Sequence, residues 1–280
     1  MADNREWQAK HSEVISTFLK YLNGETDNFI LKGGTALMSC YGLDRFSEDI
    51  DLDGKDKSIG EIVSDFCEKE GFSYRVAKDT DTVKRYMINY GNISKPLKVE
   101  ISFRKKVIEQ AEITKINGIS VYSIDSLCAM KANAYVGRDK IRDLYDLSFI
   151  CNRYWDTLPA TLKAVVRNAV EHKGIEQFDY IVRDQQDDLI DKDKLAGDFL
   201  EMYDKLGLLF DENEQKIIDE TFQKRVTALS APAKAPDPAA PAKKASMADR
   251  LTSAQSEAER RNNEKSADQK PFNKHNDHEI

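Results

Sequence analysis

The segment LKGGTALMSCYGLDRFSEDIDL, residues 31–52, decides how this chain folds and where its chemistry is expected. Gly33 and Gly34 follow a short apolar run, and Asp49 and Asp51 flank a single isoleucine further along. The pattern predicts a buried strand at 28–32, a short helix at 35–41 that opens after the glycines, and a strand at 48–53. The segment is either a turn before a solvent-exposed acidic strand or a binding site for phosphate and metal.

The acidic strand alone does not decide between these interpretations. Side chains two positions apart share a face of a strand, so Asp49, Asp51 and Asp53 point one way and Ile50 and Leu52 the other. Neighbouring carboxylates repel, and a divalent cation such as Mg²⁺ turns that repulsion into affinity. A solvated edge strand is nevertheless the commoner explanation of an isolated Asp-x-Asp pattern.

The glycines add weight to the second interpretation. Gly33 and Gly34 between a strand and a helix let backbone N–H groups approach a phosphate, and the helix start adds partial positive charge. Thr35 offers a hydroxyl in the same turn. A Gly-Gly pair is usually only a turn, but its combination with an Asp-x-Asp strand is much less common.

A third acid occurs in LKVEISF, where Glu100 interrupts an apolar alternation. It is either an outward residue of an antiparallel strand, sharing its face with Lys98 and Ser102, or a partner of the first two acids. If this strand neighbours the strand at 48–53, three carboxylates converge. That arrangement suits two metals across an in-line phosphoryl displacement.

The fourth element is KANAYVGRDKIRDLYDL, residues 131–147. Gly137 is expected to separate two helices, with Asp139 as the N-cap of the second. Arg142 and Asp146 are four residues apart and are expected to pair. Such a segment is by default a charged surface helix, but beside a carboxylate site its cations suit a triphosphate. These cations are Lys131, Arg138, Lys140 and Arg142.

The remaining patterns predict an α+β protein with a mixed sheet, flanking helices and a helical C-terminal part. Domain boundaries are expected at 1–122 for the α/β domain, 123–230 for the helical domain and 231–280 for a disordered tail, because APAKAPDPAAPAKKAS and the residues after it lack large apolar side chains. Further helices are expected at 5–21 and 58–70, and further strands at 72–77, 84–90, 97–104 and 119–122, with helix breaks near Gly137, Pro159, Gly174 and Gly207.

Composition narrows the possible functions. The chain of 280 residues has a net charge of −7, which argues against indiscriminate nucleic-acid binding. It lacks a secretory signal and any apolar run long enough to span a membrane, so a cytoplasmic location is expected. The four cysteines are far apart and predict buried thiols, and the four histidines, none near the opening segment, leave little material for a Ser-His-Asp triad.

Four features of the chain together resemble the AbiEii/AbiGii toxin family. They are GGTAL, Arg45-x-Ser47-x-Asp49-Ile50-Asp51, a later strand with one glutamate, and Arg142-Asp143-x-x-Asp146-Leu147. These are minimal nucleotidyltransferases of bacterial toxin–antitoxin and phage-defence (abortive infection) operons, and MenT toxins are relatives. The resemblance covers about residues 10–210 and implies a nucleotidyltransferase-type sheet. The wider superfamily usually has Gly-Ser at Gly33-Gly34, which implies that Thr35 supplies the hydroxyl.

The resemblance also implies roles for individual residues. Arg45 and Ser47 would brace the loop before the acidic strand, and Asp53 would have a minor role. The implied catalytic residues are Asp49, Asp51, Glu100 and Asp146, of which Asp49, Asp51 and Glu100 bind metal. The implied nucleotide-binding residues are Gly33, Gly34, Thr35, Lys131, Arg138 and Arg142. Among the cations, Lys131 and Arg142 match the family's basic positions, and Arg138 and Lys140 are the weaker candidates.

The implied reaction is transfer of a nucleoside monophosphate from an NTP to an acceptor hydroxyl, with Mg²⁺ (Mn²⁺ as a substitute) and release of pyrophosphate. The implied acceptor is RNA, foremost the 3′ end of tRNA, and the implied partner is an antitoxin encoded nearby; no membrane is involved. Three alternatives stay open: a nucleotidyltransferase that modifies a protein or small-molecule hydroxyl, a non-catalytic NTP-binding module, and an interaction protein that works through its tail.

Overall fold

A computed structural model describes residues 2–91, 93, 95–209, 221 and 224 of the chain. All the described residues lie in the first of the two units into which the chain divides, residues 1–230. The predicted tail lies outside the described residues. The predicted boundary between residues 122 and 123 falls inside the first unit and stays a prediction.

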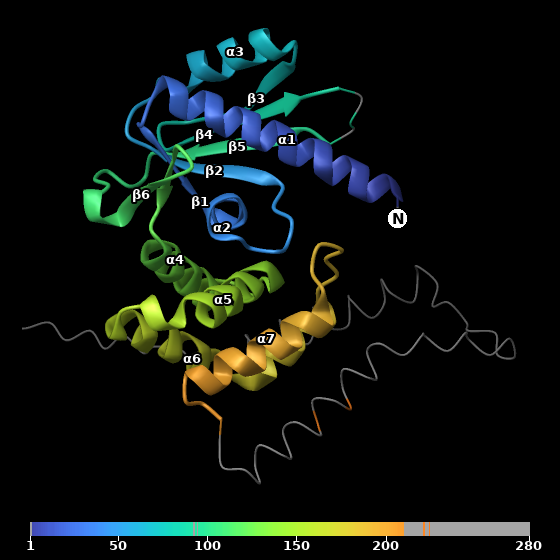
Figure 1. The fold of residues 1–280 in the computed structure, drawn as a ribbon, viewed down its shortest axis with the longest axis vertical. Coiled ribbons are helices and arrows are strands. Elements are labelled where there is room, and N and C mark those ends of the chain that lie inside the picture. The colour runs from blue at the N-terminus through green and yellow to red at the C-terminus, as the bar shows by residue number, and fades with distance from the viewer. Residues whose placement is uncertain (1, 92, 94, 210–220, 222–223, 225–280) are drawn as a thin grey trace, which may run out of the picture. The chain divides into compact units, whose positions relative to one another are not determined.

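The described residues form one mixed sheet of seven strands in the order β3-β4-β5-β2-β1-β7-β6 (Figure 1). The β1–β2, β3–β4, β4–β5 and β6–β7 pairs are antiparallel, whereas β2–β5 and β1–β7 are parallel. The strands are β1 (Phe29–Lys32), β2 (Asp49–Gly54), β3 (Ser73–Asp79), β4 (Val83–Asn89), β5 (Leu97–Ser102), β6 (Ile113–Ile116) and β7 (Ile119–Tyr122).

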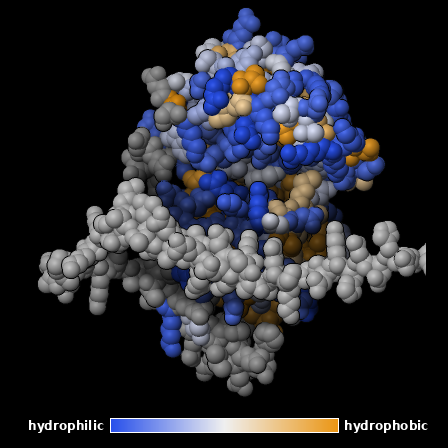
Figure 2. Space-filling model, turned by 180° about the vertical axis from the view of Figure 1, so that it is seen from behind, coloured by the Kyte–Doolittle hydropathy of each residue, from blue (hydrophilic) through white to orange (hydrophobic). Residues whose placement is uncertain are grey.

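Helices cover both faces of this sheet. Figure 1 shows α1 and α3 on one side, and α2 on the other between the sheet and α4 and α5. Hydrophilic side chains dominate the described surface seen from behind (Figure 2). The helices are α1 (Ala2–Glu25), α2 (Gly33–Tyr41), α3 (Ile59–Glu70), α4 (Ile124–Gly137), α5 (Ile141–Tyr154), α6 (Ala160–Asp184) and α7 (Lys192–Lys205), with 3₁₀ turns at Gln110–Glu112 and Trp155–Thr157.

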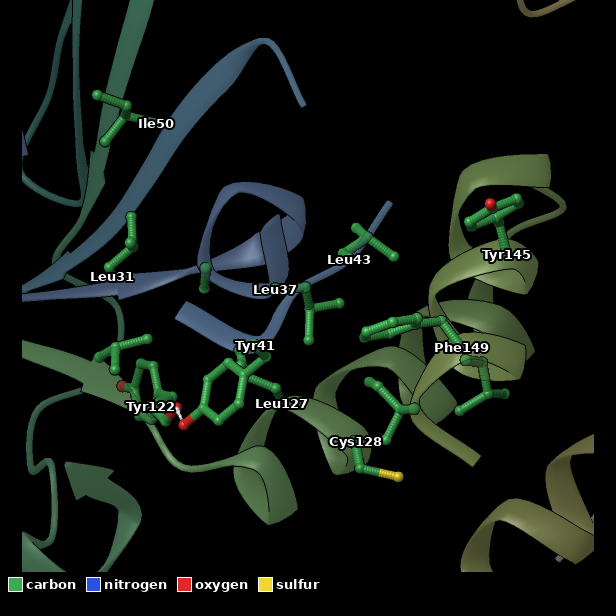
Figure 3. Close-up of a cluster of buried hydrophobic side chains, with 14 of the residues drawn as sticks. Leu31, Leu37, Tyr41, Leu43, Ile50, Tyr122, Leu127, Cys128, Tyr145 and Phe149 are labelled. Atoms are coloured by element: carbon green, nitrogen blue, oxygen red, sulfur yellow. Dashed lines mark hydrogen bonds between the residues drawn. The ribbon is translucent and has the colours of Figure 1, made fainter. Parts of the chain in front are cut away.

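One hydrophobic core runs from the sheet into the helical part. Leu37 and Tyr41 of α2 lie among Leu127 of α4 and Phe149 of α5 (Figure 3). The Tyr41 hydroxyl also donates to the carbonyl of Tyr122 at 2.8 Å. Burying each such side chain stabilises the fold by roughly 1.5–3 kcal/mol. The helix that opens at the two glycines is therefore held firmly from both sides.

The α+β class and most predicted elements are confirmed. The predicted breaks at Gly137, Pro159, Gly174 and Gly207 also occur; Gly174 has non-helical backbone inside α6, and Gly207 follows α7. Strand β6 was missed, because ITKI is short and half exposed and carries a weak pattern. The prediction that Asp139 caps α5 is wrong: Lys140 occupies that position, and Asp139 instead accepts from the Lys173 ammonium at 2.8 Å.

All four cysteines of the sequence lie in the described part of the chain. All four cysteines there are free; Cys67, Cys128 and Cys151 are buried and Cys40 is half-buried, as expected for structural thiols. No helix among the described residues is long and apolar enough to cross a membrane.

Candidate active site

Four charged side chains form a row across neighbouring strands of the sheet. In the register, Arg85 of β4 lies opposite Glu100 of β5, Glu100 opposite Asp51 of β2, and Asp51 opposite Lys32 of β1. Directly opposed residues share a face, so this face carries the row. The Arg85 guanidinium donates from Nε to Glu100 Oε2 at 2.6 Å, and its Nη2 lies 2.5 Å from the same oxygen.

A second cation stands beside the acidic strand. Lys98 lies opposite Asp49, and its Nζ is 2.6 Å from Asp49 Oδ2. Asp53, the third acid of β2, is buried and bonded to Lys32 and to the Tyr122 hydroxyl, the latter at 2.9 Å. Asp49 and Glu100 are thus each paired with one cation, and the contacts of Asp53 give it a role in stabilising the fold.

Asp51 differs from its neighbours, because its carboxylate has no hydrogen bond or ion pair among the residues the structure describes. Burial raises the pKa of Asp51; the Lys98 ammonium opposes this, and the carboxylates of Asp49 and Glu100 raise it further. The ionised form of Asp51 is therefore held at a cost in free energy that an added cation would remove.

Gly33 brings the start of α2 against Asp51. Its φ is +76°, and a Cβ there would lie 3.0 Å from Asp51 Oδ2. Both the left-handed backbone and the close approach require glycine. Lys32, at the N-cap, makes no side-chain cap hydrogen bond. The first N–H groups of α2 therefore lack a side-chain acceptor and suit an anion.

Gly34 meets different neighbours. A Cβ at Gly34 would lie 2.7 Å from both Arg45 Nη2 and Ser47 Oγ, so these two side chains use the space that a side chain there would occupy. The Thr35 hydroxyl is buried; it donates to the carbonyl of Asp49 and lies 3.0 Å from Ser47 Oγ. Thr35 thus braces β2, while the Ser47 hydroxyl lies against Gly34.

Gly34→Ala is expected to destabilise the fold by about 1–3 kcal/mol, because the new methyl group overpacks against Arg45 and Ser47, both of which are buried. The check is the urea midpoint of unfolding. Gly24→Ala is the matched control: Gly24 lies in α1 with no atom near the added methyl, so alanine should stabilise by about 0.5–1 kcal/mol. Equal midpoints for the two variants would contradict this account of Gly34.

A buried ion-pair cluster joins the loop before β2 to α4 and α5. Asp146 is fully buried; Arg45 donates to it from Nε at 2.6 Å and from Nη2 at 2.7 Å, and Lys131 Nζ lies 2.6 Å away. Asp143, also buried, accepts from Arg138 Nε at 2.7 Å and from Lys131 at 3.2 Å. Arg45 therefore braces the loop, as the resemblance implied, and it does so through Asp146.

The predicted pairing of Arg142 with Asp146 is wrong. Arg142 donates from Nε to Asp187 at 2.5 Å and lies 3.4 Å from Glu48. The two residues share a helix, but the side chain of Asp146 is buried, whereas that of Arg142 is partly exposed. In the buried environment Asp146 is neutralised by Arg45 and Lys131 instead.

Three of the four predicted triphosphate cations thus have carboxylate partners in this structure, and the fourth, Lys140, is exposed. The exposed side-chain fractions are 61% for Arg138, 36% for Arg142 and 11% for Lys131, so the two arginines are the more accessible. The pKa of Arg138 is raised mainly by Asp143, and Asp51 also contributes. The charge of Arg138 therefore interacts with that of Asp51 on the acidic strand.

Three functional residues were not predicted from the sequence: the cation partners Asp143 and Asp187, and Arg85. Asp143 had a signal, since Arg142-Asp143-x-x-Asp146 repeats an acid at helical spacing. Arg85 and Asp187 had none, because their partners are distant in the chain and nothing local marks the pairing.

His11 is near the site although it is far from it in sequence. Its ring is buried, and Nε2 donates to the carbonyl of Glu48 at 2.7 Å, which leaves Nδ1 to accept from the Tyr90 hydroxyl. Burial lowers the pKa of His11. A neutral ring is consistent with this pair of bonds, which fix the backbone just before Asp49.

The carboxylates fit a divalent cation in charge and chemistry. No three carboxylate, histidine or thiol groups among the described residues are gathered as a ready metal site, because Asp49 turns to Lys98 and Glu100 to Arg85. The unpaired, partly repelled carboxylate of Asp51 is the observation that favours a cation, and oxygen ligands of this kind suit Mg²⁺. Asp49, Asp51 and Glu100 are the residues that would hold it.

Solved structures share this architecture. The crystal structure of JHP933 from Helicobacter pylori matches with a TM-score of 0.60 and 28% identity, over 80% of this chain and 98% of that chain. A second structure, of a candidate nucleotidyltransferase from H. pylori, matches with a TM-score of 0.59 and 26% identity, over 77% of this chain and 98% of that one.

Sequence comparison gives the family. An uncharacterised protein of Aquifex aeolicus, aq_aa25, is 29% identical over 141 residues; the match covers 48% of this chain and 63% of that protein, less than two thirds of its length. The family model described as nucleotidyl transferase AbiEii toxin, type IV TA system, matches residues 17–231, well over half of the chain. The chain therefore belongs to the AbiEii nucleotidyl transferase toxin family of type IV toxin–antitoxin systems.

Proposed function

We propose that this chain is a toxin that transfers a nucleoside monophosphate from an NTP to a hydroxyl of an RNA acceptor, foremost the 3′ end of tRNA. The reaction needs Mg²⁺, with Mn²⁺ as a substitute, releases pyrophosphate, and is held in check by an antitoxin encoded nearby. The observation that carries the proposal is the unpaired carboxylate of Asp51 against the glycine-lined start of α2.

The phosphates of the NTP belong at the start of α2. The N–H groups after Gly33 have no side-chain cap, and the helix adds partial positive charge there. Arg138 and Arg142 supply further charge when they exchange Asp143 and Asp187 for phosphate oxygens. When bound between Asp49, Asp51 and Glu100, Mg²⁺ supplies charge neutralisation of the phosphates.

The acceptor hydroxyl belongs on the side of Glu100. Its oxygen forms a bond to the α-phosphorus, the bond from that phosphorus to the bridging oxygen breaks, and pyrophosphate leaves. Glu100 takes the proton of the hydroxyl, and its contact with Arg85 holds the carboxylate in place. Asp146, fully buried and bonded to Arg45 and Lys131, acts by positioning the loop.

The test is incubation of the full chain with each of four α-labelled NTPs and Mg²⁺, in the presence of total tRNA, of nuclease-treated protein extract, or of neither. Label is expected on tRNA with one preferred NTP, and omission of metal by chelation should abolish it. Label on protein instead would support a nucleotidyltransferase of different acceptor. NTP binding by calorimetry without any transfer product would support a binding module and overturn the proposal.

The toxin assignment has its own test. Expression of the chain is expected to arrest growth, and co-expression of the neighbouring open reading frame should restore it. Unchanged growth on expression of an active enzyme would contradict the toxin role.

A further inference from the structure

Strand β3 forms one edge of the sheet, and all of its residues are exposed. Two of them are cations, Arg75 and Lys78. The register sets Arg75 opposite Met87 and Lys78 opposite Arg85, both on β4. Since Arg85 is itself opposite Glu100, which is opposite Asp51, Arg75 and Lys78 lie on the same face of the sheet as the candidate active site.

A β-bulge is responsible for this common face. The pairing of β3 with β4 shifts between Val76 and Lys78, so Ala77 is an extra residue. In a regular strand, positions 75 and 78 would point to opposite faces, because side chains alternate. The bulge turns Lys78 to the face of Arg75. Bulges commonly re-aim a side chain next to a functional site.

The charge on this face is not explained by folding. Lys78 stands directly opposite Arg85, and like charges at opposed positions destabilise a sheet. Among the described residues neither Arg75 nor Lys78 has a hydrogen bond or ion pair. On the other face of the same strand Asp79 has a cation, Lys84, at 3.7 Å. The two cations of β3 that lack a carboxylate partner therefore lie on the same face of the sheet as the acidic strand.

We propose that Arg75, Lys78 and Arg85, here called the basic strip, bind the phosphate backbone of the single-stranded end of a nucleic-acid acceptor. This rests on the proposed function for the chemistry at Asp51. Strand β3 is three strand spacings from β2, about 14 Å. A strand of a few nucleotides spans that distance and brings its terminal hydroxyl to Glu100 and Asp51. Exposed cations that follow a backbone are typical of single-strand binding.

An RNA acceptor fits the strip better than a protein acceptor does. Each phosphate that meets a cation releases a counterion, which gives affinity without base recognition. Repeated phosphates match cations that recur along one face, whereas the uncharged backbone around a protein hydroxyl offers nothing for Arg75 and Lys78 to neutralise.

The test is the double variant Arg75→Gln/Lys78→Gln of the full chain. Its Michaelis constant for the RNA acceptor is expected to rise about tenfold, with kcat and the Michaelis constant for NTP unchanged. For binding of labelled single-stranded RNA, log affinity declines with log salt, and this decline should become shallower. The magnitude of its slope should decrease by about 0.7 for each lost phosphate contact. Arg75→Lys/Lys78→Arg should restore both quantities.

The matched control is Lys20→Gln/Lys69→Gln, which removes two exposed cations from α1 and α3 on the other side of the sheet. It should leave RNA binding and its salt slope at the wild-type values. Wild-type RNA binding and acceptor kinetics in the strip variant, or an equal loss in the control, would overturn the inference. Strip-dependent RNA binding in a chain that transfers no nucleotide would instead overturn the proposed function alone.

Discussion

Asp51→Asn is expected to reduce nucleotide transfer at least about 100-fold, since it removes the one carboxylate in the row that has no cation of its own. The substitution keeps the shape of the side chain and removes its charge. Transfer of label from the preferred NTP to its acceptor measures the effect, and the growth arrest caused by expression should disappear with it.

The same variant should fold as well as the wild-type chain or better. The raised pKa of Asp51 means that the fold disfavours the ionised form, so at neutral pH the wild type carries a stability cost that asparagine removes. The urea midpoint is the readout. Glu68→Gln, an exposed change on α3, is the control for activity. More than a tenth of wild-type transfer in Asp51→Asn would show that Asp51 is not part of the catalytic machinery.

Asp146→Ala is expected to destabilise the protein by about 3–5 kcal/mol, because it leaves Arg45 and Lys131 buried without their shared carboxylate. Against a typical total of about 5–15 kcal/mol this is a large fraction. Urea unfolding of the full chain measures it. Glu201→Ala breaks a pair on the surface of α7 and should change the free energy of unfolding by only about 0.3–0.5 kcal/mol.

A double variant separates the loss of a contact from the burial of unmatched charge. Arg45→Met/Asp146→Leu removes the Arg45–Asp146 pair together, so it should recover much of the stability lost in Asp146→Ala. Transfer activity is expected to stay low in the double variant, because Arg45 then no longer holds the loop before β2. A double variant no more stable than Asp146→Ala would show that packing, rather than charge, sets the loss at this position.

The prediction for Asp146 follows from the way the helical part supports the acidic strand. The loop between α2 and β2 reaches Asp146 through Arg45, and Arg142 through Glu48. His11 of α1 fixes the carbonyl of Glu48. The backbone just before Asp49 and Asp51 is thus held by α1 and α5, two elements that are far apart in sequence.

Local patterns were enough to predict most elements. The alternation in LKVEISF and the run before Gly33 marked β5 and β1, and Gly71, in left-handed backbone after α3, marked the end of that helix. These signals are local because side-chain period and backbone freedom are properties of a few consecutive residues. The candidate site residues were predicted from type and spacing, and the structure brings Asp49, Asp51 and Glu100 onto adjacent strands.

The sequence did not indicate which acidic and basic residues bind each other in the folded protein. Arg142 and Asp146 have the spacing of a helical pair, yet Asp146 binds Arg45, which is distant in the chain. A buried carboxylate takes the cations that share its low-dielectric surroundings, and only packing determines which these are. The same holds for Gly34, whose need for a bare Cα comes from Arg45 and Ser47 rather than from its own backbone angle.

The strand and helix periods, the glycines that open α2 and the acids of β2 could all be predicted from the sequence, because each depends on neighbours along the chain. Only folding places β2 between β1 and β5, pairs Asp146 with Arg45, and turns Lys78, through the bulge at Ala77, toward the face of the candidate active site. Strand register and buried charge pairing depend on residues that meet only after folding, and local spacing carries no record of them.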